Sequence, residues 1–114
     1  MATGVEGCYG AVQSHNLFRL QAIWQPQNQN DQENLRQLSR IIGTSDLSAT
    51  VGERVERPPA IGPEAATMDF TVPLTWQDPP RAAHNAMLVF RAEFVRAAGR
   101  WEMSSCRIVG APKF

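Results

Sequence analysis

The last third of the chain, residues 84–109, contains the pattern that most restricts how this sequence can fold. Apolar residues occupy every second position from Leu88 to Phe94, Ala98-Gly99 interrupts the alternation, and it resumes at Trp101. Strict alternation of this kind is typical of a half-buried β-strand. The pattern therefore predicts a long antiparallel hairpin with one apolar face, and the residues upstream are expected to cover that face.

The register of this hairpin follows from burial. A two-residue turn at Ala98-Gly99 pairs Phe94 with Met103 and places Trp101 on the apolar face, whereas a three-residue loop would set Met103 opposite Glu93. Because a slip of one residue reverses every side chain, burial favours the two-residue turn. With that register a second apolar face remains, and it consists of Met87, Val89, Val95, Cys106 and Ile108.

Length and charge limit the kind of protein this can be. The chain has 114 residues, enough for a single domain over 1–114. Its 11 basic and 11 acidic side chains cancel, so no net field attracts nucleic acid or an anionic membrane surface. The apolar runs are much shorter than the roughly 20 residues of a membrane-spanning helix. We therefore expect neither nucleic-acid binding nor membrane insertion.

The first 42 residues have helical periodicity. Apolar residues three and four apart predict helices over about 3–13, 17–24 and 31–42. Asn16 is expected to cap the second helix, and the spacing of Asn30 and Glu33 is typical of a capping box at the start of the third.

From Ser45 the period changes to two, and the alternation predicts four strands in an antiparallel meander, over about 46–56, 65–76, 84–97 and 100–109. Pro73 cannot donate a backbone hydrogen bond, so it is expected at a bulge or on an unpaired side of its strand. A turn is expected over Gln77–Pro80. The fold class is therefore α+β, with three N-terminal helices followed by an antiparallel sheet of about four strands.

The two cysteines, Cys8 and Cys106, leave two alternatives. They lie outside any CxxC spacing and are accompanied by only two histidines, so a metal site is not expected. Two buried thiols that act as small hydrophobic side chains are the favoured interpretation. The alternative is a Cys8–Cys106 disulfide, which would require an oxidising compartment.

The order of elements and the closing motif VRAAGRWEM, Val95–Met103, resemble the NTF2-like superfamily, especially its SnoaL-like and small stand-alone members. The opening segment from Cys8 to Trp24 is also similar to the start of that family. The resemblance implies a cone in which the helices pack on the concave face of a curved, cystatin-like sheet. It also implies a ligand pocket, which here would be lined by Tyr9, Trp24, Phe70, Leu74, Trp76, Phe90 and Trp101.

Family enzymes place an acid or a base inside this cone, but the inward rows of this sequence are almost free of ionisable groups. His84 and Glu53 are the weak candidates for a catalytic pair, and the simpler interpretation is that both lie at the rim in water. No phosphate-binding, dinucleotide-binding or zinc-protease motif is present, and no cofactor is expected.

Three functions remain open. The favoured one is a non-catalytic NTF2-like module that binds a small apolar ligand or a protein partner, with a homodimer formed through Met87, Val89, Val95 and Ile108. The second is a SnoaL-like acid–base isomerase, dehydratase or hydrolase. The third is a sensory domain detached from a larger bacterial signalling protein, which would place it outside the cytoplasm, whereas a true start at Met1 would favour a cytoplasmic protein.

Overall fold

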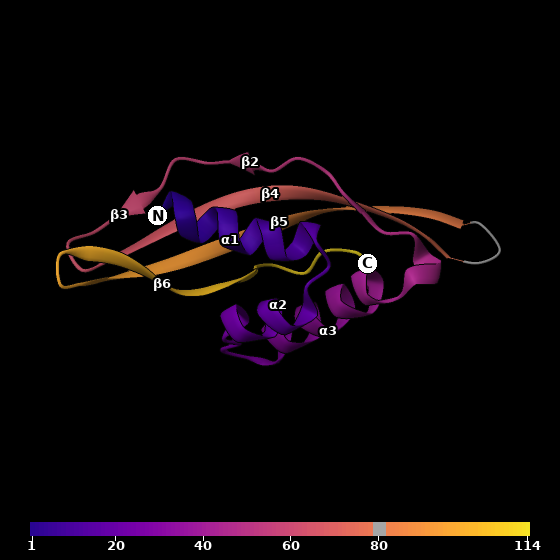
Figure 1. Cartoon of the computed structure of the whole chain (residues 1–114), viewed down its shortest axis with the longest axis horizontal. Helices are drawn as coiled ribbons and strands as arrows, with labels where there is room; N and C mark the ends of the chain where they lie inside the picture. The colour runs from indigo at the N-terminus through magenta and orange to yellow at the C-terminus, as the bar shows by residue number, and fades with distance from the viewer. Residues whose placement is uncertain (79–81) are drawn as a thin grey trace.

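Three helices precede a strongly curled antiparallel sheet in the computed structural model, which describes residues 1–78 and 82–114 (Figure 1). The helices pack against the inner face of the sheet, as the predicted α+β class requires. The elements are α1 (Ala2–Gln13), α2 (Leu17–Trp24), α3 (Gln29–Gly43), the 3-10 helix η1 (Ser45–Leu47), β1 (Thr50–Val51), β2 (Val55–Glu56), β3 (Ala60–Ile61), β4 (Ala65–Asp78), β5 (Ala82–Ala97) and β6 (Arg100–Ile108).

The long strands β4 and β5 form the centre of the sheet. They pair over their whole described length, and this register places Phe70 directly opposite Phe90. Directly paired residues share a face, so the alternating apolar positions of both strands form one buried surface. Of the turn expected over Gln77–Pro80, Pro79 and Pro80 lie outside the described residues, while Gln77 and Asp78 belong to β4.

The prediction of a single strand over 46–56 is wrong. The structure has η1 at its start and then the short pieces β1 and β2, which pair with β4, as does the further piece β3. Between β1 and β2, residues 52–54 stand opposite only Val72 and Pro73, so one residue is extra. The Pro73 carbonyl accepts a hydrogen bond from the Gly52 N–H at 2.8 Å. Pro73 therefore faces a break in the edge strand, as predicted, and its missing N–H disrupts no bond to β5.

The hairpin of β5 and β6 turns at Ala98-Gly99, and Phe94 pairs with Met103, both as predicted. Ala98 has φ +50° and Gly99 has φ +76°, the positive values that a tight two-residue hairpin turn requires. One residue further along β6 the register changes, because Glu93 pairs with Ser105 and Ser104 has no partner. Ser104 is therefore the extra residue of a β-bulge.

This bulge corrects the expected outer face. Beyond Ser104 every side chain of β6 changes sides, so Cys106 and Ile108 pair with Ala92 and Phe90 and are fully buried in the core. The expectation that Cys106 and Ile108 lie on the second apolar face is wrong.

The same reversal brings Cys106 against α1. Its Cα lies 6.4 Å from that of Cys8, and the two residues form a disulfide between the first helix and the last strand. The preference for two free thiols is therefore wrong. No local signal in the sequence marks the bulge, and without it Cys106 would have pointed away from α1.

Side-chain caps define where two helices begin. Asn16 accepts a hydrogen bond from the Arg19 N–H and caps α2, as predicted. The prediction of a capping box at Asn30 is wrong, because α3 begins earlier. Its cap is Asn28, whose side chain accepts a hydrogen bond from the Asp31 N–H at 2.8 Å. The Asn30 amide instead donates to the carbonyl of Gly110 and ties α3 to the chain after β6.

A buried ion network joins α3 to the sheet. The Arg107 guanidinium of β6 contacts the Asp31 carboxylate at 3.0 Å and also pairs with Glu93 of β5. Asp31 and Arg107 are both buried, and the Asp31 carbonyl accepts the indole N–H of Trp24 at 2.8 Å. Removing one charge from such a network leaves the others unpaired away from water, which costs several kcal/mol.

We expect the substitution Arg107→Met to lower the free energy of unfolding by about 3–5 kcal/mol, because it leaves the Asp31 carboxylate buried without a counterion. Urea denaturation of both proteins measures the difference. Arg91→Met is the matched control: its ion pair with Asp69 is half exposed, so the loss should be at most about 1 kcal/mol. Equal losses in the two variants would contradict the structural role given to Arg107.

Candidate functional site

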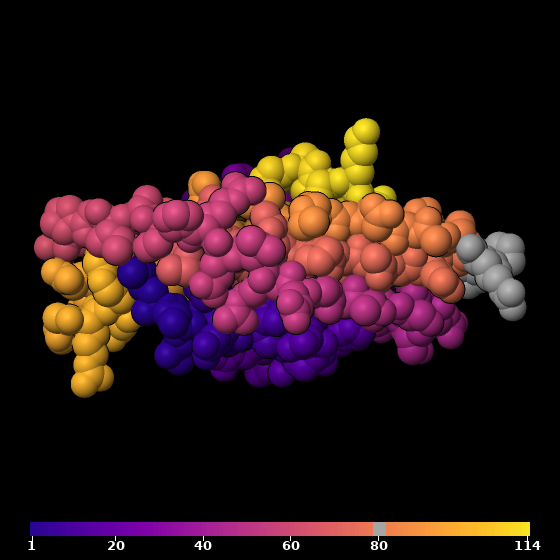
Figure 2. Space-filling view, turned by 90° about the horizontal axis from the view of Figure 1, so that it is seen from above, coloured from indigo at the N-terminus to yellow at the C-terminus, as the bar shows by residue number. Residues whose placement is uncertain are grey.

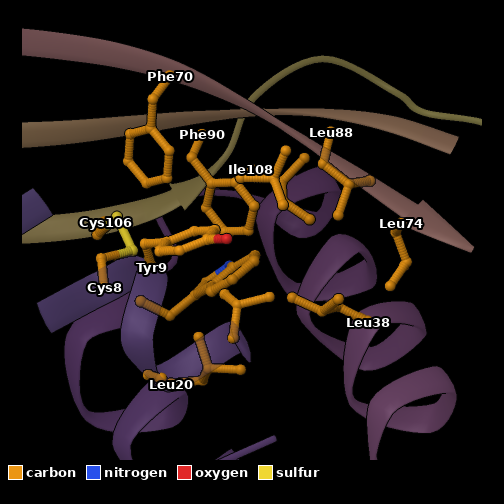
Figure 3. Packing of buried hydrophobic residues seen from close by; sticks show 14 of the residues in the cluster. Cys8, Tyr9, Leu20, Leu38, Phe70, Leu74, Leu88, Phe90, Cys106 and Ile108 are labelled. Atoms are coloured by element: carbon orange, nitrogen blue, oxygen red, sulfur yellow. A yellow bond between two sulfur atoms is a disulfide. The ribbon is translucent and has the colours of Figure 1, made fainter. Parts of the chain in front are cut away.

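The interior of the cone is filled with side chains. Six of the seven residues predicted to line a pocket are buried, and they belong to one continuous hydrophobic core (Figure 3). The seventh, Trp101, is half-buried near the hairpin turn, where the Arg96 guanidinium lies 5.0 Å from the centre of its ring. The six buried residues are Tyr9, Trp24, Phe70, Leu74, Trp76 and Phe90.

The aromatic rings at the centre are packed against one another. The rings of Phe70 and Phe90 stack with centroids 5.2 Å apart, and Trp24 meets Phe90 edge-on at 6.1 Å. These are the separations of close aromatic contacts in protein cores. The rings therefore occupy the space that a ligand would need.

One hollow, of about 520 Å³, opens beside α1 at the broken edge of the sheet, and Glu53 lies there. The Tyr9 hydroxyl donates to the Gly52 carbonyl at 2.7 Å, and the Arg54 guanidinium lies 5.1 Å from the Tyr9 ring centre. Arg54 thus covers the exposed side of Tyr9. The hollow is lined by Tyr9, Gln13, Glu53, Arg54 and Glu56.

A second hollow, of about 290 Å³, contains His84. The imidazole stacks on the Trp76 indole with centroids 5.4 Å apart, and its Nε2 lies 2.8 Å from a carboxylate oxygen of Asp78. His84 and Glu53 therefore line different hollows, and the structure does not bring them together as a pair. Asp78 was missed because the expected strand ended at Trp76, two residues before it.

Among residues 1–78 and 82–114, no group of three or more His, Cys, Asp or Glu side chains is arranged to hold a metal ion.

Within the same residues, no helix has the length and apolar character needed to cross a membrane.

The outer face of the sheet, opposite the helices, carries a group of neighbouring side chains that are apolar except for Thr71. Val55 pairs with Thr71, Thr71 with Val89, and Pro73 with Met87, so these five side chains share one face across β2, β4 and β5. We call them the outer patch. Met87 is 59% exposed and Val55 is 64% exposed, large fractions for apolar side chains on a sheet. Figure 2 shows β4 and β5 open at the molecular surface, without helices over them.

Charged residues bound the outer patch on one side. The Arg91 guanidinium donates to both carboxylate oxygens of Asp69, at 2.9 and 3.1 Å. These hydrogen bonds raise the pKa of Arg91, so its guanidinium stays charged. Glu93, two residues after Arg91 on β5, forms an ion pair with Arg107. Val95 lies beyond both pairs, about 20 Å along β5 from Val89, and is separate from the outer patch.

The sequence matches no known family profile, and no curated protein matches it. The fold is recognised among solved structures instead.

Three solved structures share the arrangement of elements. A protein from Xanthomonas campestris, titled as a calcium/calmodulin-dependent protein kinase II association domain, has a TM-score of 0.51 and 10% identity, covering 94% of this chain and 82% of that one. An uncharacterised protein with a cystatin-like fold from Caulobacter vibrioides has a TM-score of 0.54 and 13% identity, covering 96% and 87%. A protein titled as a dehydratase of the NTF2-like family, from Streptomyces avermitilis, has a TM-score of 0.55 and 13% identity, covering 99% and 94%.

The chain therefore has the NTF2-like, cystatin-like fold, as its sequence resemblance predicted. At these identities the likeness concerns the fold alone, because one fold serves many functions.

We expect Phe90→Ala to lower the free energy of unfolding by about 3–5 kcal/mol, because Phe90 is fully buried between Phe70 and Trp24. Chemical denaturation measures the loss. Tyr9→Phe is the milder comparison: it removes only the hydroxyl that bonds to Gly52 and should cost about 0.5–1.5 kcal/mol. A loss below about 1 kcal/mol at Phe90 would indicate that its ring lines open space.

Proposed function

We propose that this chain is a non-catalytic NTF2-like module that binds a protein partner, and that the partner is a second copy of the chain docked on the outer patch. The observation that carries the proposal is the exposure of Met87 and Val55 on a continuous apolar part of the sheet. Apolar side chains clustered on an open sheet face favour association, because burying them removes their surface from water.

The filled cone supports a protein partner over a small apolar ligand. A ligand inside the cone would have to displace the stacked rings of Phe70 and Phe90 or of Trp24. Packed cores resist such displacement, since side chains there fill almost all of the space. The outer patch needs no rearrangement before it can be covered.

The surroundings of the outer patch suit a partner that is identical. In a two-fold dimer the outer patch of one copy packs on the outer patch of the other. The charged groups at the border of one patch then lie near the border of the other patch. Asp69 and Arg91 are adjacent at this border and carry opposite charges, so each can face its counterpart across the interface. The Xanthomonas campestris protein of similar fold is described as an association domain, which agrees with an assembly role.

An acid–base enzyme is the second candidate, and one observation favours it. His84 lines an open hollow, and Asp78 places a carboxylate oxygen 2.8 Å from its Nε2, so a candidate base and an acidic neighbour lie together there. Asp78 replaces Glu53 as the partner of His84 in this alternative. A detached sensory domain also stays a prediction, and the reading frame upstream of Met1 in the gene would test it.

We expect the wild type to be a dimer in light scattering coupled to size exclusion, and Val89→Glu to be a monomer. A glutamate there would place two like charges in an apolar interface, since Val89 lies within the outer patch. The matched control is Val95→Glu, which makes the same change on the same strand beyond the Asp69–Arg91 pair and should leave the dimer intact. A wild type that is monomeric at high micromolar concentration would contradict the proposal.

A further inference from the structure

We infer that helix α1 is a lid that the Cys8–Cys106 disulfide holds closed over the sheet, and that reduction of this bond releases it. The inference does not depend on the dimer proposed above, because α1 packs on the inner face of the sheet and the outer patch lies on the other. Two observations support it: α1 has a sequence that forms a helix poorly, and a covalent bond attaches its middle to β6.

The sequence of α1 is a poor helix former. Gly4, Gly7 and Gly10 lie inside it, and each glycine disfavours a helix relative to alanine because it loses more backbone freedom on folding. No side chain caps its first turn, no acidic residue is present there, and no basic residue is present in the last turn. A helix of twelve residues with this composition depends on tertiary contacts for its stability.

The tertiary contacts of α1 need one of these glycines. A Cβ at Gly4 would lie 2.9 Å from a ring carbon of Phe94 and 3.3 Å from Met103, so the absence of a side chain lets α1 approach the sheet. Further along, Tyr9 anchors the helix to Gly52 through its hydroxyl. Between these two contacts lies Cys8, whose bond to Cys106 attaches α1 to β6.

The disulfide changes how far α1 can move. While the disulfide is intact, it keeps the middle of α1 next to β6, even though Cys8 and Cys106 are 98 residues apart in the chain. After reduction α1 is held by the Tyr9 hydrogen bond and by the packing of its buried residues, which include Val5 and Val12. Its opening takes these side chains out of the core and uncovers Phe94 and Met103 beneath Gly4. Figure 1 shows α1 lying along the sheet, with its C-terminal end next to α2.

The chemical step is thiol–disulfide exchange with a dithiol reductant. Because Cys8 and Cys106 are fully buried, the attack takes place during a local opening that exposes one of the two sulfurs. One thiolate of the dithiol attacks that sulfur, and the other cysteine sulfur leaves as a thiolate and is protonated. The second thiolate of the reductant then displaces the remaining cysteine. The products are two cysteine thiols and one cyclic disulfide of the reductant, so two electrons pass from the dithiol to the protein disulfide.

Hydrogen exchange of the full chain, oxidised and after treatment with dithiothreitol, tests the inference. We expect protection of the α1 amides to fall by about 30-fold or more on reduction, with α3 and the β4–β5 amides changing little. Unchanged protection of α1 would overturn the inference. A parallel loss in α1, α3 and the sheet would also overturn it, because the disulfide would then support the whole fold and not the lid.

A pair of glycine substitutions separates helix weakness from other effects of reduction. No atom lies within 4 Å of a Cβ placed at Gly10, so Gly10→Ala should raise α1 protection in the reduced protein by about 2–5-fold. Gly4→Ala makes the same change where the new methyl group meets Phe94, and it should lower that protection. If Gly10→Ala gives no gain in the reduced state, helix propensity does not limit the closed lid and the inference fails.

Discussion

A single extra residue in β6, Ser104, determines how the two layers of this protein are joined. The side chains of a strand alternate between its faces, so one unpaired residue exchanges the faces of all that follow. Cys106 and Ile108 enter the core for this reason, and Cys106 reaches Cys8 on α1. Arg107 moves to the other face of β6, beside Glu93, and reaches Asp31 at the start of α3. The covalent and the ionic link between helices and sheet thus both follow the bulge.

The two faces of the sheet consequently have different roles. The inner face is closed by packed rings, with Phe90 in contact with Phe70 and Trp24. The polar groups that family enzymes would hold inside lie at the margins, where His84 and Glu53 occupy separate hollows. The outer face keeps an uncovered apolar area beside an ion pair. Association through that face agrees better with this distribution than catalysis in the cone does.

Stability is also distributed unevenly over the helices. Helix α3 is capped by Asn28, is tied to the segment after β6 through Asn30, and contributes Asp31 to the buried ion network. Helix α1 has three internal glycines and lacks a side-chain cap, so it depends on its buried side chains and on the disulfide. Elements with low local stability are those that open first in proteins, which makes α1 the natural moving part.

The sequence by itself determined the three helices, the long strands and the register at the β5–β6 turn. Alternation fixed β4, β5 and the Ala98-Gly99 turn, and helical spacing fixed the three helices, because these patterns depend on neighbours within one element. The broken edge at Gly52, the bulge at Ser104 and the Cys8–Cys106 bond were decided only in the tertiary structure. A bulge forms where a strand must bend to pack against other elements, and nothing in the local sequence marks Ser104 as unpaired. The same limit explains why Ile108 was expected outside and lies in the core.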